Sequence, residues 1–214
     1  MSKIKLKVCG MRDASNILEV ASLQPDYMGF IFYETSPRFV GEEFRVPDNF
    51  PDHIERVGVF VNETAENITA ISGKLKLTCV QLHGSESPEQ CRLLKEKGLL
   101  VIKAFSVDDT FDFDQTKKYK PHVDFFLFDT KGKFHGGNAK RFNWEILRNY
   151  DQEIPFFLSG GLTPENITEI SALEGMNIHA IDINSGVEVK PGWKNVTAIR
   201  EVNELINSTT LNKL

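Results

Sequence analysis

The chain has 214 residues and a net charge of -5 at neutral pH, with 41% hydrophobic and 26% charged residues. These are ordinary globular values, and the acidic balance argues against a general nucleic-acid binder, which normally carries a basic face. No apolar run approaches the ~20 residues that a membrane-spanning helix needs, and the N-terminal residues lack the apolar core of a secretion signal. We therefore expect a cytoplasmic protein that binds neither nucleic acid nor membrane.

Short apolar runs alternate with longer amphipathic segments along the chain. Most of the runs are rich in Val, Ile, Leu and Phe on both faces, as parallel strands covered on both sides should be. The predicted strands are 4–8, 27–32, 56–61, 79–82, 100–104, 125–128, 156–158 and 180–183.

Helix-capping residues occur between the predicted strands. The predicted N-caps are Asp13, Thr64, Ser87 and Thr163, the last two followed by Pro at the first helical position. The last helix is expected over about 195–205. Segments 41–52 and 109–118 have weak helical patterns, but strand signals resume beyond each of them, so we expect no domain boundary.

Eight strands in 214 residues leave about 27 residues for each strand–helix unit (214/8), close to the compact limit of a (β/α)8 barrel. The alternative is an open doubly wound sheet, whose dinucleotide site would want G-x-G-x-x-G after the first strand. Residues 9–13 offer one glycine there, Gly10. We predict a single-domain (β/α)8 TIM barrel over residues 1–214.

The three cysteines form no C-x-x-C pair and have no metal-ligand spacing, which argues against a disulfide framework or a metal site. Cys79 lies in an apolar run and Cys91 in a helical pattern, so both are interpreted as core residues. Cys9 differs because it ends the first strand. In this fold the chemistry takes place at the C-terminal ends of the strands.

Four other polar residues come at or just after the ends of predicted strands: Arg38, His83, Asp129 and Asp182. Each of the first three has an ordinary explanation taken alone, namely a surface charge, a loop histidine and a strand-end cap. Asp182 lies inside an apolar strand, where a buried carboxylate needs a partner. Because all four fall on one predicted rim with Cys9, together they indicate an active site.

Glycine-rich loops follow the last two strands. Barrels of this kind frequently bind phosphate between these loops, where glycine lets backbone N–H groups approach the oxygens. The predicted phosphate-binding residues are Gly160, Gly161, Ser185 and Gly186. We therefore expect a small phosphorylated substrate.

These residues, taken in order, resemble the phosphoribosylanthranilate isomerase family of tryptophan biosynthesis. The stretches that carry the resemblance are KVCGM (7–11), GFIF (29–32), SPR (36–38), GVFVN (58–62), QLHG (81–84), LSGGL (158–162) and SGVE (185–188). Each stretch is weak alone, but the ordered set spans essentially the whole chain.

The resemblance implies an Amadori rearrangement of N-(5-phosphoribosyl)anthranilate to 1-(2-carboxyphenylamino)-1-deoxyribulose 5-phosphate, with no metal or organic cofactor. Asp129, which follows the apolar run 125–128, is expected to be the general acid that protonates the ring oxygen as the ring opens. Cys9, as thiolate, would remove the proton from sugar carbon 2. By the same resemblance, Arg38 would bind the anthranilate carboxylate, Asp182 a ribose hydroxyl, and His83 would lie near the substrate.

Two details stay open in the sequence. A thiolate at Cys9 needs a positive neighbour, and the candidates are the helix N-terminus at 13–15, Lys7 and Arg12. The chain also departs from the family pattern, with GGNA at 136–139 and FNW at 142–144 in place of GG(T/S)G and FDW. Family members occur as monomers and as homodimers, and we expect one of these two states.

Other functions are possible for the same residues. A neighbouring phosphosugar enzyme, indole-glycerol-phosphate synthase, would want a lysine acid and extra N-terminal sequence, and a pentose-phosphate epimerase would want metal-binding His and Asp at several strand ends. A non-catalytic phosphate-binding barrel gives no reason to pair Cys9 with Asp129. A thiol redox protein needs a second cysteine near Cys9, whereas Cys79 is expected on the opposite rim.

Overall fold

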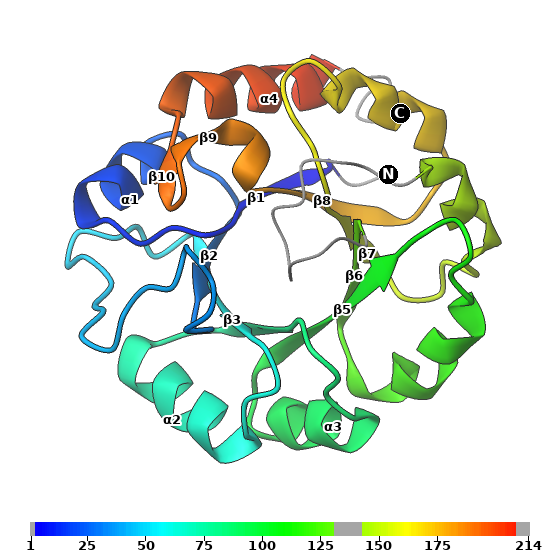
Figure 1. The fold of residues 1–214 in the computed structure, drawn as a ribbon, viewed down its shortest axis with the longest axis horizontal. Helices are drawn as coiled ribbons and strands as arrows, with labels where there is room; N and C mark the ends of the chain where they lie inside the picture. Colours follow the sequence, from blue (N-terminus) through cyan, green and yellow to red (C-terminus); the bar gives the residue numbers. More distant parts are fainter. Residues whose placement is uncertain (1–2, 131–142, 209–214) are drawn as a thin grey trace.

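The computed structural model describes residues 3–130 and 143–208. Eight parallel strands follow one another around a closed barrel, and the last pairs with the first (Figure 1). The strands are β1 (Lys5–Val8), β2 (Tyr27–Ile31), β3 (Glu55–Phe60), β4 (Cys79–Leu82), β5 (Leu100–Val107), β6 (Phe125–Thr130), β7 (Phe156–Leu158) and β8 (Ile178–Ile183). The predicted (β/α)8 barrel is confirmed, and the open doubly wound sheet is excluded.

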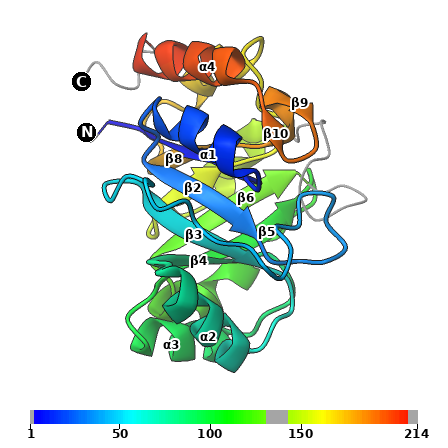
Figure 2. The same ribbon diagram turned by 90° about the vertical axis from the view of Figure 1, so that its left-hand side faces the viewer.

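Four α-helices cover the outside of the barrel: α1 (Ala14–Ala21), α2 (Ala65–Leu75), α3 (Pro88–Glu96) and α4 (Val196–Ser208) (Figures 1 and 2). Three predicted caps are present, since the side chains of Asp13, Thr64 and Ser87 accept hydrogen bonds from N–H groups of the first turn. None of the four α-helices is long and apolar enough to cross a membrane, nor is any other helix in the described ranges.

The units after β5, β6 and β7 contain 3-10 helices: η1 (Phe113–His122), η2 (Trp144–Asn149) and η3 (Ile167–Leu173). The prediction that Thr163 caps the helix after β7 is wrong, because η3 begins after Asn166. The Asn166 amide instead closes the preceding loop: it accepts from Thr163 N at 2.9 Å and donates to Gly161 O at 2.8 Å. Between β2 and β3 the chain forms no helix, in line with the weak pattern at 41–52.

Side chains at alternate strand positions fill the barrel in layers, as the period of two requires. Nearer the N-terminal ends of the strands the interior is apolar and consists of Tyr27, Val57, Cys79, Ile102, Ala104, Leu127, Phe157 and Ala180. Two residues further along three of these strands come Gln81, Asp129 and Asp182. Strand β1 adds Lys7, and Cys9 directly follows it. Cys79 and Cys91 are both fully buried, which confirms their interpretation as core residues.

A short hairpin follows β8, and the sequence did not predict it. The 3-10 turn η4 (Ser185–Val187) leads into β9 (Glu188–Lys190), which pairs antiparallel with β10 (Trp193–Lys194). The hairpin carries two charged side chains, Glu188 and Lys194, back toward the first two strand ends of the barrel. Its position therefore matters for the site described next.

Candidate active site

One pocket lies at the C-terminal ends of the strands and gathers most of the predicted site residues. Its polar lining consists of Tyr33, Ser36, Cys9, Gln81, His83, Asp129, Ser159, Asp182, Asn184 and Ser185 together with the backbone of Gly160, Gly161 and Gly186. Arg38 does not line this pocket. The remaining walls are apolar side chains such as Ile31 and Val59.

Cys9 lies directly after β1 and its thiol is directed to β2. A Cβ built on Gly29 would come within 2.8 Å of Cys9 Sγ, so the glycine at this strand position leaves the space that the thiol occupies. Burial raises the pKa of Cys9, and the charges of Lys7 and Lys194 act in the opposite direction. The free protein therefore holds Cys9 mainly as a thiol, beside two cations that favour the thiolate.

Of the cations considered from the sequence, Lys7 faces the thiol. Arg12 is exposed and donates to Pro37 O at 3.2 Å. The N-terminal N–H groups of α1 are taken up by the carboxylate of Asp13. Lys194 was missed in the sequence, because nothing in its local pattern indicates that the hairpin folds back toward Cys9.

Lys7 is fully buried inside the barrel. Its Nζ lies 2.8 Å from Asp182 Oδ1 and 2.8 Å from Gln81 Oε1. Burial alone would lower the pKa of Lys7, but the charges of Asp182 and Cys9 outweigh that effect and raise the pKa. Asp182 thus has the partner that a buried carboxylate in an apolar strand needs, and Ser159 Oγ lies 3.4 Å from its other oxygen.

Asp129 ends the run of phenylalanines in β6 and is 4% exposed. Its Oδ1 accepts a hydrogen bond from the backbone N of Thr130 at 2.9 Å. Its Oδ2 lies 3.4 Å from Nε2 of His83, whose Nδ1 is 2.8 Å from Gln81 Nε2. Cys9 and Asp129 therefore reach the same pocket from strands on different sides of the barrel.

Arg38 lies at the edge of the site, with its stem over Gly10: a Cβ on Gly10 would be 2.8 Å from Arg38 Cδ. Its guanidinium is bound by Glu188, with Nε 2.9 Å from Oε1 and Nη2 2.6 Å from Oε2. The same carboxylate accepts from Lys194 Nζ at 2.7 Å. Burial lowers the pKa of Lys194 to about 8, although Glu188 acts in the opposite direction.

The two glycine loops have the geometry expected of an anion site. Gly160 and Gly161 have φ of +99° and +66°, a region that side-chain-bearing residues rarely adopt. Within the described ranges, neither backbone N–H donates a hydrogen bond. A Cβ on Gly186 would lie 1.9 Å from Leu162 O, so the second loop packs directly on the first.

Comparison with known proteins identifies the family. The family described as N-(5'phosphoribosyl)anthranilate (PRA) isomerase matches residues 6–204. The chain belongs to the phosphoribosylanthranilate isomerase family. An N-(5'-phosphoribosyl)anthranilate isomerase from Parabacteroides distasonis is 45% identical over 198 residues, covering 91% of this chain and 90% of the relative. A relative from Phocaeicola vulgatus with the same name is 42% identical, and the match covers 94% of this chain and 97% of the relative.

Solved structures of phosphoribosylanthranilate isomerases are similar over nearly the whole chain. The Thermotoga maritima enzyme superposes with a TM-score of 0.82 at 32% identity, covering 95% of this chain and 98% of its own. Another, in complex with reduced 1-(o-carboxyphenylamino)-1-deoxyribulose 5-phosphate, has a TM-score of 0.77 at 31% identity, with coverages of 99% and 100%. The resemblance seen in the sequence is therefore confirmed as family membership.

The departure from the phosphoribosylanthranilate isomerase pattern at 136–139 lies outside the described residues. Asn143 is described, and its side chain accepts a hydrogen bond from Glu145 N at 3.2 Å to open η2. Among residues 3–130 and 143–208, no three His, Cys, Asp or Glu side chains are grouped so that they could hold a metal ion.

Proposed function

We propose that this protein catalyses the Amadori rearrangement of N-(5-phosphoribosyl)anthranilate to 1-(2-carboxyphenylamino)-1-deoxyribulose 5-phosphate, a step of tryptophan biosynthesis. The observation that carries the proposal is the placement of Cys9 and Asp129 in one pocket beside the Gly160–Gly161 loop. A thiol and a carboxyl group on different strands can act on opposite sides of a sugar held between them. The identity to named isomerases supports the same reaction.

In the proposed reaction Asp129 begins protonated. It gives its proton to the ring oxygen as the bond between that oxygen and C1′ breaks, and the nitrogen lone pair forms the C1′=N bond. The thiolate of Cys9 then takes the proton from C2′, and the electron pair of that bond forms C1′=C2′ as the nitrogen regains its lone pair. The resulting enaminol becomes the ketone by moving its hydroxyl proton to C1′. One proton must then pass from Cys9 back to Asp129 before the next turnover.

Both ends of the substrate are anions, and the site offers a partner for each. The 5′-phosphate would bind the N–H groups of Gly160 and Gly161, which donate to no described residue, with Ser185 and Gly186 on the neighbouring loop. The anthranilate carboxylate would bind Arg38, whose Nη1 donates no hydrogen bond to a described residue. Because Glu188 holds the Nε edge of the fork, the substrate would bind the opposite edge, a detail that the sequence did not suggest.

The ribose between these anchors would lie over Asp182, which is itself held by Lys7. A hydroxyl donating to Asp182 would orient C2′ toward Cys9, which directly follows the adjacent strand β1. Register supports this arrangement, since Lys7 and Asp182 are directly paired across β1 and β8.

Turnover of the proposed substrate is the direct test. The purified protein is mixed with freshly made phosphoribosylanthranilate, and the loss of its fluorescence is followed together with formation of the carboxyphenylamino ketose by chromatography. Conversion to that ketose supports the proposal. Binding of the substrate without conversion would instead favour the non-catalytic phosphate-binding barrel.

The alternatives raised by the sequence have less support. Cys79 is buried at the first residue of β4, at the end of the barrel opposite Cys9, so it is not in position to resolve a disulfide. A cytoplasmic location, a single domain over 1–214, the absence of a nucleic-acid partner and a monomeric or homodimeric state remain predictions. Sedimentation at working concentration distinguishes the two oligomeric states.

A further inference from the structure

A row of polar contacts leads from Lys7 through Gln81 and His83 to Asp129, and the last three of these residues line the pocket. We infer that Gln81 fixes the tautomer of His83 with its hydrogen on Nε2, so that the ring donates to Asp129 and cannot take the proton of that acid. Gln81 and His83 are then positioning residues for the general acid. This inference rests on the proposed function, in which Asp129 protonates the ring oxygen.

Lys7 determines which atom donates and which accepts in each hydrogen bond of the row. An ammonium group has three donors and no acceptor. The amide atom 2.8 Å from Lys7 Nζ must therefore be the oxygen of Gln81, because the opposite orientation would place two donors against each other. The second contact of Lys7, with Asp182 at 2.8 Å, keeps the ammonium in place. The orientation of the Gln81 amide is thus decided by chemistry rather than by the similarity of its two ends.

The orientation of the Gln81 amide then determines the tautomer of the His83 ring. Gln81 Nε2 lies 2.8 Å from Nδ1 of His83, and an amide nitrogen only donates. Nδ1 must accept, and in a neutral imidazole the hydrogen then resides on Nε2. Nε2 is 3.4 Å from Asp129 Oδ2. The two atoms form no hydrogen bond in this structure, so the inference requires this contact to shorten when substrate binds, as catalytic contacts often do.

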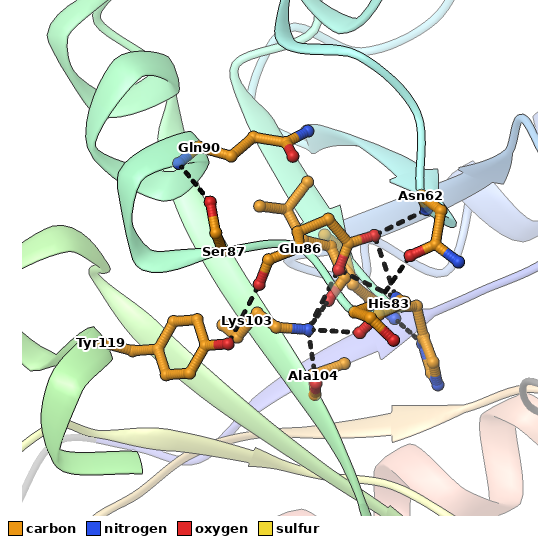
Figure 3. Close-up of polar contacts among 12 residues, drawn as sticks. Asn62, His83, Glu86, Ser87, Gln90, Lys103, Ala104 and Tyr119 are labelled. Atoms are coloured by element: carbon orange, nitrogen blue, oxygen red, sulfur yellow. Dashed lines mark hydrogen bonds and ion pairs between the residues drawn. The ribbon is translucent and has the colours of Figure 1, made fainter. Parts of the chain in front are cut away.

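The backbone on both sides of His83 is held by hydrogen bonds, which fix the position from which the imidazole ring extends (Figure 3). Lys103 Nζ donates to Leu82 O at 3.1 Å and to Gly84 O at 2.8 Å, the carbonyls that flank His83. The same ammonium pairs at 3.0 Å with the buried carboxylate of Glu86, which also accepts from Gly84 N. A fully buried ion pair of this kind is costly to break, because either partner alone is left as an uncompensated charge.

The tautomer matters for the direction of proton transfer. With its hydrogen on Nε2, His83 donates to Asp129 and stabilises the carboxylate that forms when the acid gives up its proton. With its hydrogen on Nδ1, the ring would present a lone pair to Asp129 and would accept that proton itself. Gln81 therefore keeps the proton of Asp129 available to the sugar.

The substitution Gln81→Glu tests this directly. Glutamate has nearly the same shape, but both of its oxygens accept, so Nδ1 of His83 must become a donor. We expect the side-chain ¹⁵N spectrum of His83 to show an unprotonated Nδ1 in the wild type and a protonated Nδ1 in Gln81→Glu. We expect kcat to fall on the order of 10- to 100-fold with KM within about 2-fold, a smaller loss than the ~10⁴ that a wrong tautomer causes when histidine is itself the base.

Gln90→Glu is the matched control. Gln90 is the third residue of α3, whose N-cap is Ser87 (Figure 3), and glutamate is common at this helix position. The variant gives up one contact, the hydrogen bond that Gln90 Nε2 donates to Glu63 O at 2.6 Å. This variant adds the same charge without facing His83, and its ¹⁵N spectrum and kcat should match the wild type. His83→Gln, which keeps an N–H donor on a shorter reach, should retain more activity than His83→Leu.

Several results would overturn the inference. A wild-type His83 with its hydrogen on Nδ1 would do so, as would a Gln81→Glu protein with unchanged tautomer or unchanged kcat, or equal activities for His83→Gln and His83→Leu. If Gln81→Glu does not fold, the wild-type ¹⁵N spectrum and the relative activities of His83→Gln and His83→Leu still test the inference. Failure of the wild type to convert the substrate would count against the proposed function, while leaving the tautomer result readable on its own.

Discussion

The guanidinium of Arg38 is bound by Glu188 through two nitrogens, although the two residues lie 150 positions apart in the chain. Both side chains are largely buried, at 10% and 5% exposure. The fork thus has one edge bound to the hairpin after β8, and Nη1 on its other edge donates to no described residue. We expect the anthranilate carboxylate to bind this second edge.

Replacing Arg38 by Lys should mainly weaken substrate binding. The charge remains, but the planar fork that holds Glu188 and the substrate at once is lost, and we expect kcat/KM to fall by roughly 10- to 100-fold, the equivalent of one charge-assisted hydrogen bond of ~1.5–3 kcal/mol. Most of the fall should be in KM. The phosphoribosyl derivative of aniline, which has no carboxylate, provides the control, because its kcat/KM should hardly differ between Arg38→Lys and wild type. An equal loss for both substrates would contradict the assignment.

The pH profile should report the environment of Cys9. Burial raises the pKa of its thiol above the ordinary value of 9.0, and Lys7 opposes this rise. Since the thiolate is the active form in the proposed reaction, kcat/KM should increase with pH across the neutral and mildly alkaline range. Lys7→Met should move this limb to still higher pH, whereas Lys5→Met, at the lower end of β1, should leave it in place. A limb that lies below pH 7 in the wild type would argue against Cys9 as the base.

Stability should change with pH through Lys194. Burial lowers the pKa of this lysine from 10.5 to about 8. Between these values the unfolded chain binds a proton that the folded protein has released, so folded stability rises with pH over that window and is lost as pH falls through about 8. Relative to Lys194→Met, wild type should gain up to about 3 kcal/mol between pH 8 and 10.5, as measured by urea unfolding. A constant difference between the two proteins would contradict this.

The loop after β7 should tolerate no side chain at Gly160. Its φ of +99° is unfavourable for alanine, and the added Cβ would lie 2.2 Å from Thr130 Oγ1 and 2.6 Å from Thr130 N. We expect Gly160→Ala to lower stability by roughly 1–3 kcal/mol and to raise KM. Gly73→Ala in α2, where the Cβ would meet nothing within 4 Å, should stabilise by about 0.5–1 kcal/mol. Similar thermal midpoints for both variants would show that the loop relaxes freely.

The strands and most of the rim could be predicted because they are local properties of the sequence. Apolar runs of three to six residues place eight strands, and the residue after each run then falls at the C-terminal end of the barrel. Caps such as Asp13 and Ser87 act within their own first turn, so their prediction succeeded. Thr163 failed as a cap because Asn166, three residues on, folds back to Gly161 and closes the loop first.

The partners of the rim residues could not be predicted in the same way. Gln81 stood out only as part of a family stretch, since its role depends on Lys7 on another strand, 74 residues away. Glu188 and Lys194 act through a hairpin whose two short strands, of three and two residues, carry no strand signal of their own. Such contacts are set by barrel closure rather than by local sequence.

The pairing of Cys9 with Asp129 is tested by the activities of two single variants. Cys9→Ala and Asp129→Asn are assayed for conversion of phosphoribosylanthranilate, after circular dichroism and thermal unfolding have shown that each folds as wild type does. We predict that kcat falls by ~10²–10⁴ in each variant, the scale of a lost general base or general acid. If either variant converts the substrate at close to the wild-type rate, that residue is not the acid or base of this reaction.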